Sequence, residues 1–124
     1  VTVRQILFKG NISLIRRTKA AKEFLIGHRS LAKSPTFIED SINVLKDYLG
    51  NKLNFDGRSM TQFDIERILF PYKVSAATLS ETKEVFDLIE KAQYGGLILS
   101  ASDRNEIAEK LKMLFEKFEK EMKI

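Results

Sequence analysis

Histidine and cysteine, which often act as catalytic bases, nucleophiles or metal ligands, are nearly absent from this sequence. His28 is the only histidine, and the 124 residues contain no cysteine. At helical spacing the neighbours of His28 are Phe24, Leu25, Leu31 and Ala32, and none of these can ligate a metal or relay a proton. A zinc site or a catalytic triad needs several such groups. We therefore expect His28 to lie at the edge of a hydrophobic core.

A polar segment at Asn54-Phe55-Asp56-Gly57 resembles the middle of a calcium-binding loop. With Gly57 at loop position six, Lys52 would occupy position one and Phe63 position twelve, where such a loop needs carboxylates. The segment is therefore interpreted as a turn between helices, because Asn, Asp and Gly tolerate left-handed backbone.

The glycine pair in Tyr94-Gly95-Gly96 does not fit a phosphate-binding loop, which follows a strand and spreads its glycines over six positions. Here a helical pattern precedes two adjacent glycines, which indicates a helix end. We expect positive φ at Gly95 or Gly96, Tyr94 packed against neighbouring helices, and Leu97–Leu99 folded back onto the core.

Acidic pairs such as Glu39-Asp40 and Glu81/Glu84 lie at expected capping or surface positions. Helix N-termini favour negative charge, which explains these pairs without catalysis. The sequence thus predicts no catalytic, cofactor-binding or metal-ligating residue, no cofactor, and a protein that is not an enzyme.

The elements that carry these residues are all predicted to be helical, in a single-domain bundle of about five helices, one of them short. The expected segments run from near Val3 to about Arg29, from a Thr36/Glu39 capping box to Leu53, from Thr61 to Pro71, from Ser75 to about Tyr94, and from Ser100 or Ser102 onward. Gly10-Asn11 could interrupt the first segment, with Ser13 as a cap. We take 13–124 as the helical core and 1–12 as a juxtamembrane extension.

Apolar residues recur at helical spacing in each long segment and predict one buried stripe per helix. The expected stripes are Leu14, Ala21, Leu25 and His28 in the first helix; Ile38, Ile42, Leu45, Leu49 and Leu53 in the second; Leu79, Thr82, Val85, Phe86, Ile89, Ala92 and Gln93 in the fourth; and Ile107, Leu111, Leu114, Phe118 and Met122 in the last.

Positive charge is concentrated at one end of the chain. Residues 1–33 contain eight basic side chains and one acidic one, whereas the other 91 residues contain 13 basic and 16 acidic side chains. Such a cluster can bind nucleic acid, or it can flank a membrane span on its cytoplasmic side. The residues that we expect at a membrane surface or partner contact are Arg16, Arg17, Lys19 and Lys22. The acidic fourth helix makes nucleic acid the less favoured partner.

The order of these features resembles the cytoplasmic C-terminal region of BatD-type aerotolerance membrane proteins. The similarity runs from about Arg16 to the C-terminus. Its motifs are R-R-T-K-A-A-K at 16–22, F-I-E-D-S-I-N-V-L-K-D-Y-L-G-N-K-L at 37–53, M-T-Q-F-D-I at 60–65 and E-K-A-Q-Y-G-G at 90–96, followed by a serine-capped last helix. The family usually has Arg or Lys where this chain has Gln93.

This resemblance implies a cytoplasmic module of a larger protein in the bacterial inner membrane, with β-rich periplasmic domains upstream. Partners implied by it are von Willebrand A-type proteins and a MoxR-type AAA+ ATPase, and an anionic membrane surface fits the basic segment. Because the chain begins with Val1, we expect it to be part of a longer protein. The predicted function is a non-catalytic protein-interaction module. The alternatives are a nucleic-acid-binding domain and an oligomerisation domain that uses the last apolar stripe.

Overall fold

The computed structural model describes residues 3–96 and 98–122, with side chains from residue 14 onward, and all regular structure in these residues is helical. The helices are α1 (Val3–Ser30), α2 (Phe37–Leu53), α3 (Ile65–Leu69), α4 (Ala76–Tyr94) and α5 (Ala101–Glu121). Short 3₁₀ turns flank α3 at 62–64 and 70–72, and others lie at 31–33 and 57–59. The prediction of an all-α bundle of five helices, one of them short, is confirmed.

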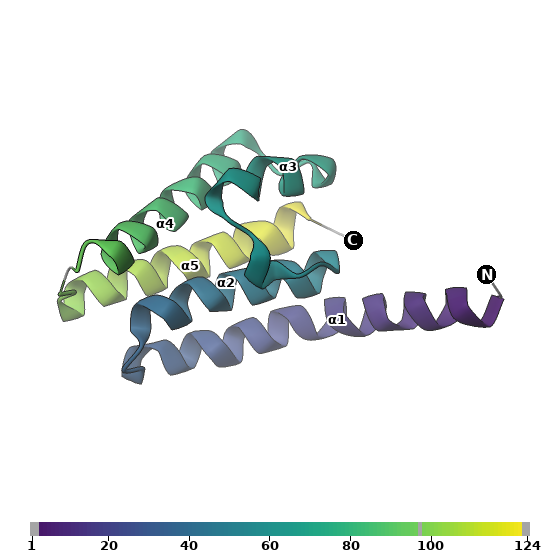
Figure 1. Ribbon diagram of the computed structural model, residues 1–124, viewed down its shortest axis with the longest axis horizontal. Coiled ribbons are helices and arrows are strands. Elements are labelled where there is room, and N and C mark those ends of the chain that lie inside the picture. Colours follow the sequence, from purple (N-terminus) through teal and green to yellow (C-terminus); the bar gives the residue numbers. More distant parts are fainter. Residues whose placement is uncertain (1–2, 97, 123–124) are drawn as a thin grey trace.

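The long helices α1, α2, α4 and α5 form the bundle, and α3 packs beside α4 (Figure 1). α1 packs mainly along α2, while α5 contacts both α2 and α4. α1 is continuous, so Gly10-Asn11 does not interrupt it and Ser13 does not cap it. Its N-terminal part runs on past the ends of the other helices, so that the first turns project from the bundle (Figure 1).

Aromatic rings from three helices form the centre of the core. The rings of Phe24 on α1 and Phe115 on α5 stack with centroids 4.4 Å apart. Tyr48 on α2 meets both of them edge-on, at 5.6 and 5.2 Å. The Tyr48 hydroxyl donates a 2.6 Å hydrogen bond to the Glu119 carboxylate, which also pairs with Lys52. Burial, together with the hydrogen bond and charge of Glu119, raises the pKa of Tyr48, so this hydroxyl remains a donor.

The predicted stripes of α2, α4 and α5 point into this core. Five residues of the α5 stripe, Ile107, Leu111, Leu114, Phe118 and Met122, are all buried. They pack within their own chain, so this stripe is not an exposed surface for self-association. On α4 the expected residue Gln93 is instead exposed.

The stripe predicted for α1 is only partly confirmed. Leu14 is 55% exposed, and the buried residues are Ala20 and Phe24, followed by Leu31 in the 3₁₀ turn. Ala21 and Leu25 are only partly buried against the core. α1 carries apolar residues on two sides, and packing on α2 and α5 selects the side that holds the bulky Phe24 ring.

Most of the predicted helix starts are confirmed. The Ser75 hydroxyl accepts from the Thr78 N–H, and Ser100 forms a capping box with Asp103. The Thr61 N–H donates to the Asp64 carboxylate over 2.9 Å. These contacts satisfy amides that lack partners inside their helices.

The capping box predicted at Thr36 and Glu39 is wrong. Thr36 precedes α2, but its side chain accepts no backbone amide hydrogen. The hydroxyls of Ser34 and Thr36 instead donate to the carboxylate of Asp40. The local reason is a backbone at Thr36 with φ −115° and ψ 51°, which is not the extended conformation of a capping residue.

The last residue of α5 also caps the first turn of α4. The Glu121 carboxylate accepts the Ser75 N–H over 2.7 Å and the Thr78 hydroxyl. Burial alone would raise the pKa of Glu121, but these hydrogen bonds outweigh it and hold the pKa below its ordinary value of 4.5. This carboxylate therefore stabilises the fold when ionised.

We expect Glu121→Gln to remove part of the pH dependence of stability. Because the folded-state pKa lies below the unfolded one, the contribution of Glu121 is present above about pH 4.5 and is lost as the pH falls through the folded-state value. Urea unfolding at pH 7 should show the variant less stable by no more than about 1 kcal/mol, since the carboxylate is partly solvated. At pH 3 the two proteins should converge. An equal gap at both pH values would contradict this role.

Candidate functional site

The four basic residues predicted to form one contact do not all lie on the same exposed surface. Arg16 is used inside the molecule, where it holds the turn after α2. Its guanidinium donates to the Asn51 and Asn54 side chains over 3.3 and 2.8 Å, and to the Phe55 carbonyl over 3.0 Å. Asn54 ends α2 in the left-handed conformation, with φ 57°. The predicted polar turn is therefore confirmed, and Arg16 binds it instead of facing outward.

Arg17 is also partly enclosed. Its side chain is half-buried, and within the described residues its Nε atom lies buried without a hydrogen-bond partner. Lys19 and Lys22, in contrast, are exposed on α1. Of the four predicted residues, only Lys19 and Lys22 are therefore available at the surface.

Lys19 and Lys22 belong to a larger surface that the sequence interpretation missed. Ile15, Lys19, Lys22, Ile26 and Arg29 are spaced by four, three, four and three residues, which places them on one side of a helix. All five are exposed, as is Leu14 beside them. We call these six residues the outward face of α1. The sequence contained evidence for this exposed face. In each of the pairs Leu14-Ile15 and Leu25-Ile26, the two adjacent side chains point in different directions on a helix, so one of them must lie outside the core.

The outward face carries no acidic side chain. The nearest acidic residue on α1, Glu23, lies at its border and accepts a 3.1 Å hydrogen bond from the Asn51 amide on α2. Among the described residues, Lys19, Lys22 and Arg29 have no ion-pair partner within 4.0 Å. The face therefore presents three uncompensated positive charges next to exposed aliphatic groups.

The turn at Tyr94-Gly95-Gly96 ends α4 as predicted, but some of its side chains do not lie where the sequence predicted them. Gly96 has φ 63°, which confirms that one glycine of the pair takes the left-handed conformation. Tyr94 is 82% exposed and Ile98 is 98% exposed, so the predictions that Tyr94 packs on neighbouring helices and that Ile98 folds inward are wrong. Leu99 does pack against the core, and Leu97 lies outside the described residues.

Gly96→Ala should lower stability by about 1 kcal/mol. An added Cβ at Gly96 would have no atom within 4 Å, so the cost comes from the left-handed backbone alone. Chemical denaturation measures the effect, and Gly96→Asn should recover part of the loss because Asn tolerates this conformation. Equal losses for Ala and Asn would contradict a purely conformational cost.

His28 lies at the core edge, as expected. Its ring stacks on Phe24 with centroids 5.7 Å apart, and its Nε2–H donates to the Ala108 carbonyl over 2.8 Å. Across residues 3–96 and 98–122, no group of three or more His, Asp or Glu side chains is arranged to hold a metal ion.

A shallow hollow beside the exposed Tyr94 provides a second surface. It lies between the start of α2 and the segment that joins α4 to α5 and is lined by Phe37, Ile38, Gln93, Ile98, Leu99 and Arg104, among others. The Arg104 guanidinium lies over the Phe37 ring, 5.2 Å from its centroid. The lining thus combines apolar side chains with the charged Glu39 and Arg104.

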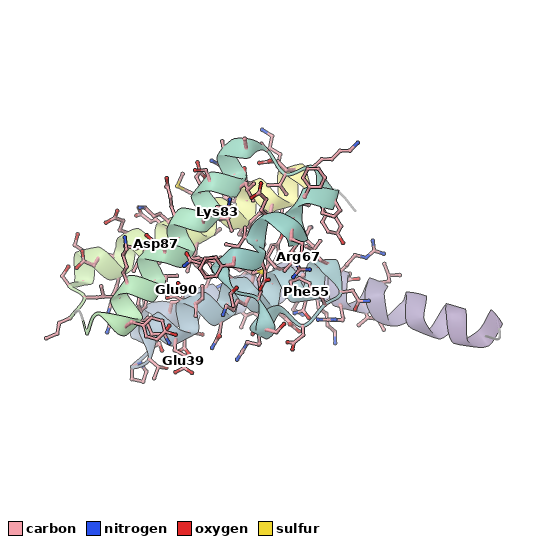
Figure 2. All side chains as sticks on the ribbon, turned by 45° about the horizontal axis from the view of Figure 1, so that its top comes forward. Glu39, Phe55, Arg67, Lys83, Asp87 and Glu90 are labelled. Atoms are coloured by element: carbon pink, nitrogen blue, oxygen red, sulfur yellow. The ribbon has the colours of Figure 1, made fainter. Side chains whose placement is uncertain are left out.

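Negative charge collects on a different part of the bundle. Figure 2 shows Asp87 and Glu90 on α4 and Glu39 at the start of α2, all remote from the projecting end of α1. Lys83 and Lys91 on α4 are paired with Glu66 and Asp87. α4 is therefore ill suited to enter a nucleic-acid groove, because its exposed acids repel phosphates.

The fold and this charge distribution define the class of protein as an all-α bundle with a basic, projecting first helix. No helix in the described part of the chain is both long and apolar enough to cross a membrane. No protein-family model matches the chain, and comparisons with curated proteins and with solved structures found no similar protein.

Proposed function

We propose that this chain is a non-catalytic protein-interaction module of a larger, membrane-anchored protein, on the cytoplasmic face of the bacterial inner membrane. The observation that carries the proposal is the first helix. It projects from the bundle (Figure 1) and belongs to a segment with eight basic residues and one acidic residue. Lys and Arg accumulate in this way on the cytoplasmic side of membrane spans.

The parent protein in this proposal is of the BatD type. The order of the basic helix, the F-I-E-D helix, the M-T-Q-F-D-I start and the Y-G-G end supports this assignment. Partners in the proposal are von Willebrand A-type proteins and a MoxR-type AAA+ ATPase. Gln93, which replaces the usual basic residue, is exposed at the hollow and would alter any contact made there.

The hollow beside Tyr94 is the surface that we assign to a protein partner. Ile98 in its lining is exposed, as is Tyr94, the neighbour in sequence of the lining residue Gln93. Exposed aromatic and aliphatic groups near a depression are typical of protein-binding surfaces.

Site-specific photo-crosslinking in cells tests this function. A photoreactive amino acid at Tyr94 or Ile98 of the parent protein should give discrete cross-linked protein bands, and the same probe at the exposed Glu109 on α5 should not. A topology reporter fused after residue 124 should read as cytoplasmic. A periplasmic reporter signal, or equal cross-linking at all three positions, would overturn the proposal.

A further inference from the structure

We propose that the outward face of α1 binds an anionic lipid surface, with its cations at the headgroups and its aliphatic side chains inserted between them. This inference rests on the proposed membrane location and adds to it a definite contact surface. α1 would then lie along the membrane plane, and the rest of the bundle would face away from it.

The aliphatic residues supply the first part of the argument. Leu14, Ile15 and Ile26 are 55%, 51% and 52% exposed; Ile15 and Ile26 lie on one side of α1, and Leu14 lies at the border of that side. Single exposed apolar residues are ordinary on protein surfaces, whereas a group on one face marks an interaction site. The opposite side of α1 is occupied, because Ala20 and Phe24 are buried in the core. Binding at the outward face therefore requires no opening of the bundle.

The charges supply the second part. Lys19, Lys22 and Arg29 lie among the aliphatic residues and make no ion pair within the described residues. The acidic residue of α1, Glu23, accepts a hydrogen bond from the Asn51 amide on α2. Partners of this face must therefore be negatively charged.

The presence of both aliphatic and positively charged side chains on this face favours lipid over other negatively charged partners. Helices that lie in a bilayer interface pair Lys and Arg with Leu, Ile or aromatic residues, and both contribute to binding. A nucleic-acid backbone would engage the three cations and leave Leu14, Ile15 and Ile26 in water. Long basic side chains can also extend past the inserted aliphatic groups to reach the headgroups.

Vesicle binding by the 124-residue chain tests the inference. We expect co-sedimentation with vesicles of equal parts phosphatidylglycerol and phosphatidylcholine, and little with pure phosphatidylcholine. Each basic residue near such a surface contributes about five-fold to binding, so Lys19→Gln, Lys22→Gln and Arg29→Gln together should weaken it by about 100-fold. A matched control, Lys91→Gln with Lys112→Gln and Lys120→Gln, makes the same change in net charge on α4 and α5 and should change binding by no more than about two-fold.

The aliphatic residues give the decisive variant. Leu14→Ser, Ile15→Ser and Ile26→Ser leave every charge in place and should weaken vesicle binding by about ten-fold or more, since each loses the burial of a half-exposed side chain. Circular dichroism and urea unfolding should show both triple variants folded, because all six side chains are exposed.

Two outcomes overturn the inference. Vesicle binding unchanged by the serine variant would show that only charge acts and that Leu14, Ile15 and Ile26 do not insert between the headgroups. Equal loss in the charge variant and its matched control would show no preference for α1. Neither result affects the cross-linking at Tyr94 and Ile98, so failure of this inference is distinguishable from failure of the proposed function.

Discussion

Replacing Phe24 with alanine should lower the free energy of unfolding by about 4 kcal/mol. Phe24 is 2% exposed and is the aromatic residue through which α1 enters the core. Its ring stacks on Phe115 and meets Tyr48 edge-on, so its removal leaves a cavity between three helices. Aromatic pairs also contribute beyond the area that they bury.

Urea unfolding monitored by circular dichroism measures this loss, and Ile26→Ala is the matched control. Ile26 lies two residues further along the same helix but is half-exposed, so its replacement should change stability by no more than about 0.5 kcal/mol. If the two variants lose similar stability, then α1 does not dock through Phe24. Because Ile26 belongs to the outward face, Ile26→Ala should also weaken binding at that face without a large loss of stability.

Gly57→Ala should also lower stability strongly, with an expected loss of about 3 kcal/mol. A Cβ atom built at Gly57 would lie 1.9 Å from the carbonyl oxygen of Lys46 and 3.1 Å from the Cα of Gly50. Both obstacles are backbone atoms of α2, which cannot rotate away as a side chain can. The 57–59 turn would have to move off the helix and would strain the Arg16 hydrogen bonds at Asn54 and Phe55.

The loss of stability expected for Gly57→Ala comes from a steric clash. A comparison with Gly96→Ala tests this. Gly96→Ala suffers only from its left-handed backbone and should lose about 1 kcal/mol. Thermal and urea unfolding of the two variants should therefore rank Gly57→Ala well below Gly96→Ala. The opposite order would mean that the turn can relax away from α2 at little cost.

The sequence predicted the fold best where a helix has a single apolar side. The stripes of α2 and α5 each offer one way of packing, and Ser75 and Ser100 are strong capping residues whose positions are confirmed. α1 offered two sides, and only the tertiary contacts of Phe24 decide between them. That choice is set by residues more than 20 positions away, which local periodicity does not contain.

Tyr94 illustrates an error that helical geometry could have prevented. The buried positions of α4 end at Ile89 and Ala92, and a residue two positions beyond Ala92 points to the opposite side of a helix. In the candidate site, too, the local sequence indicated only part of the arrangement. Lys19 and Lys22 were found from charge alone, while the internal role of Arg16 depends on a turn almost 40 residues away.

The central position of α5 has a consequence for how the protein is made. Phe24 stacks on Phe115, and the Tyr48 hydroxyl bonds to Glu119, so helices synthesised early depend on partners in the helix synthesised last of the five. While the ribosome still holds α5, the emerging α1 and α2 have an incomplete core and expose apolar rings. Cooperative folding of the bundle must therefore follow the emergence of α5 from the ribosome, and until then the nascent chain exposes apolar surface that favours aggregation.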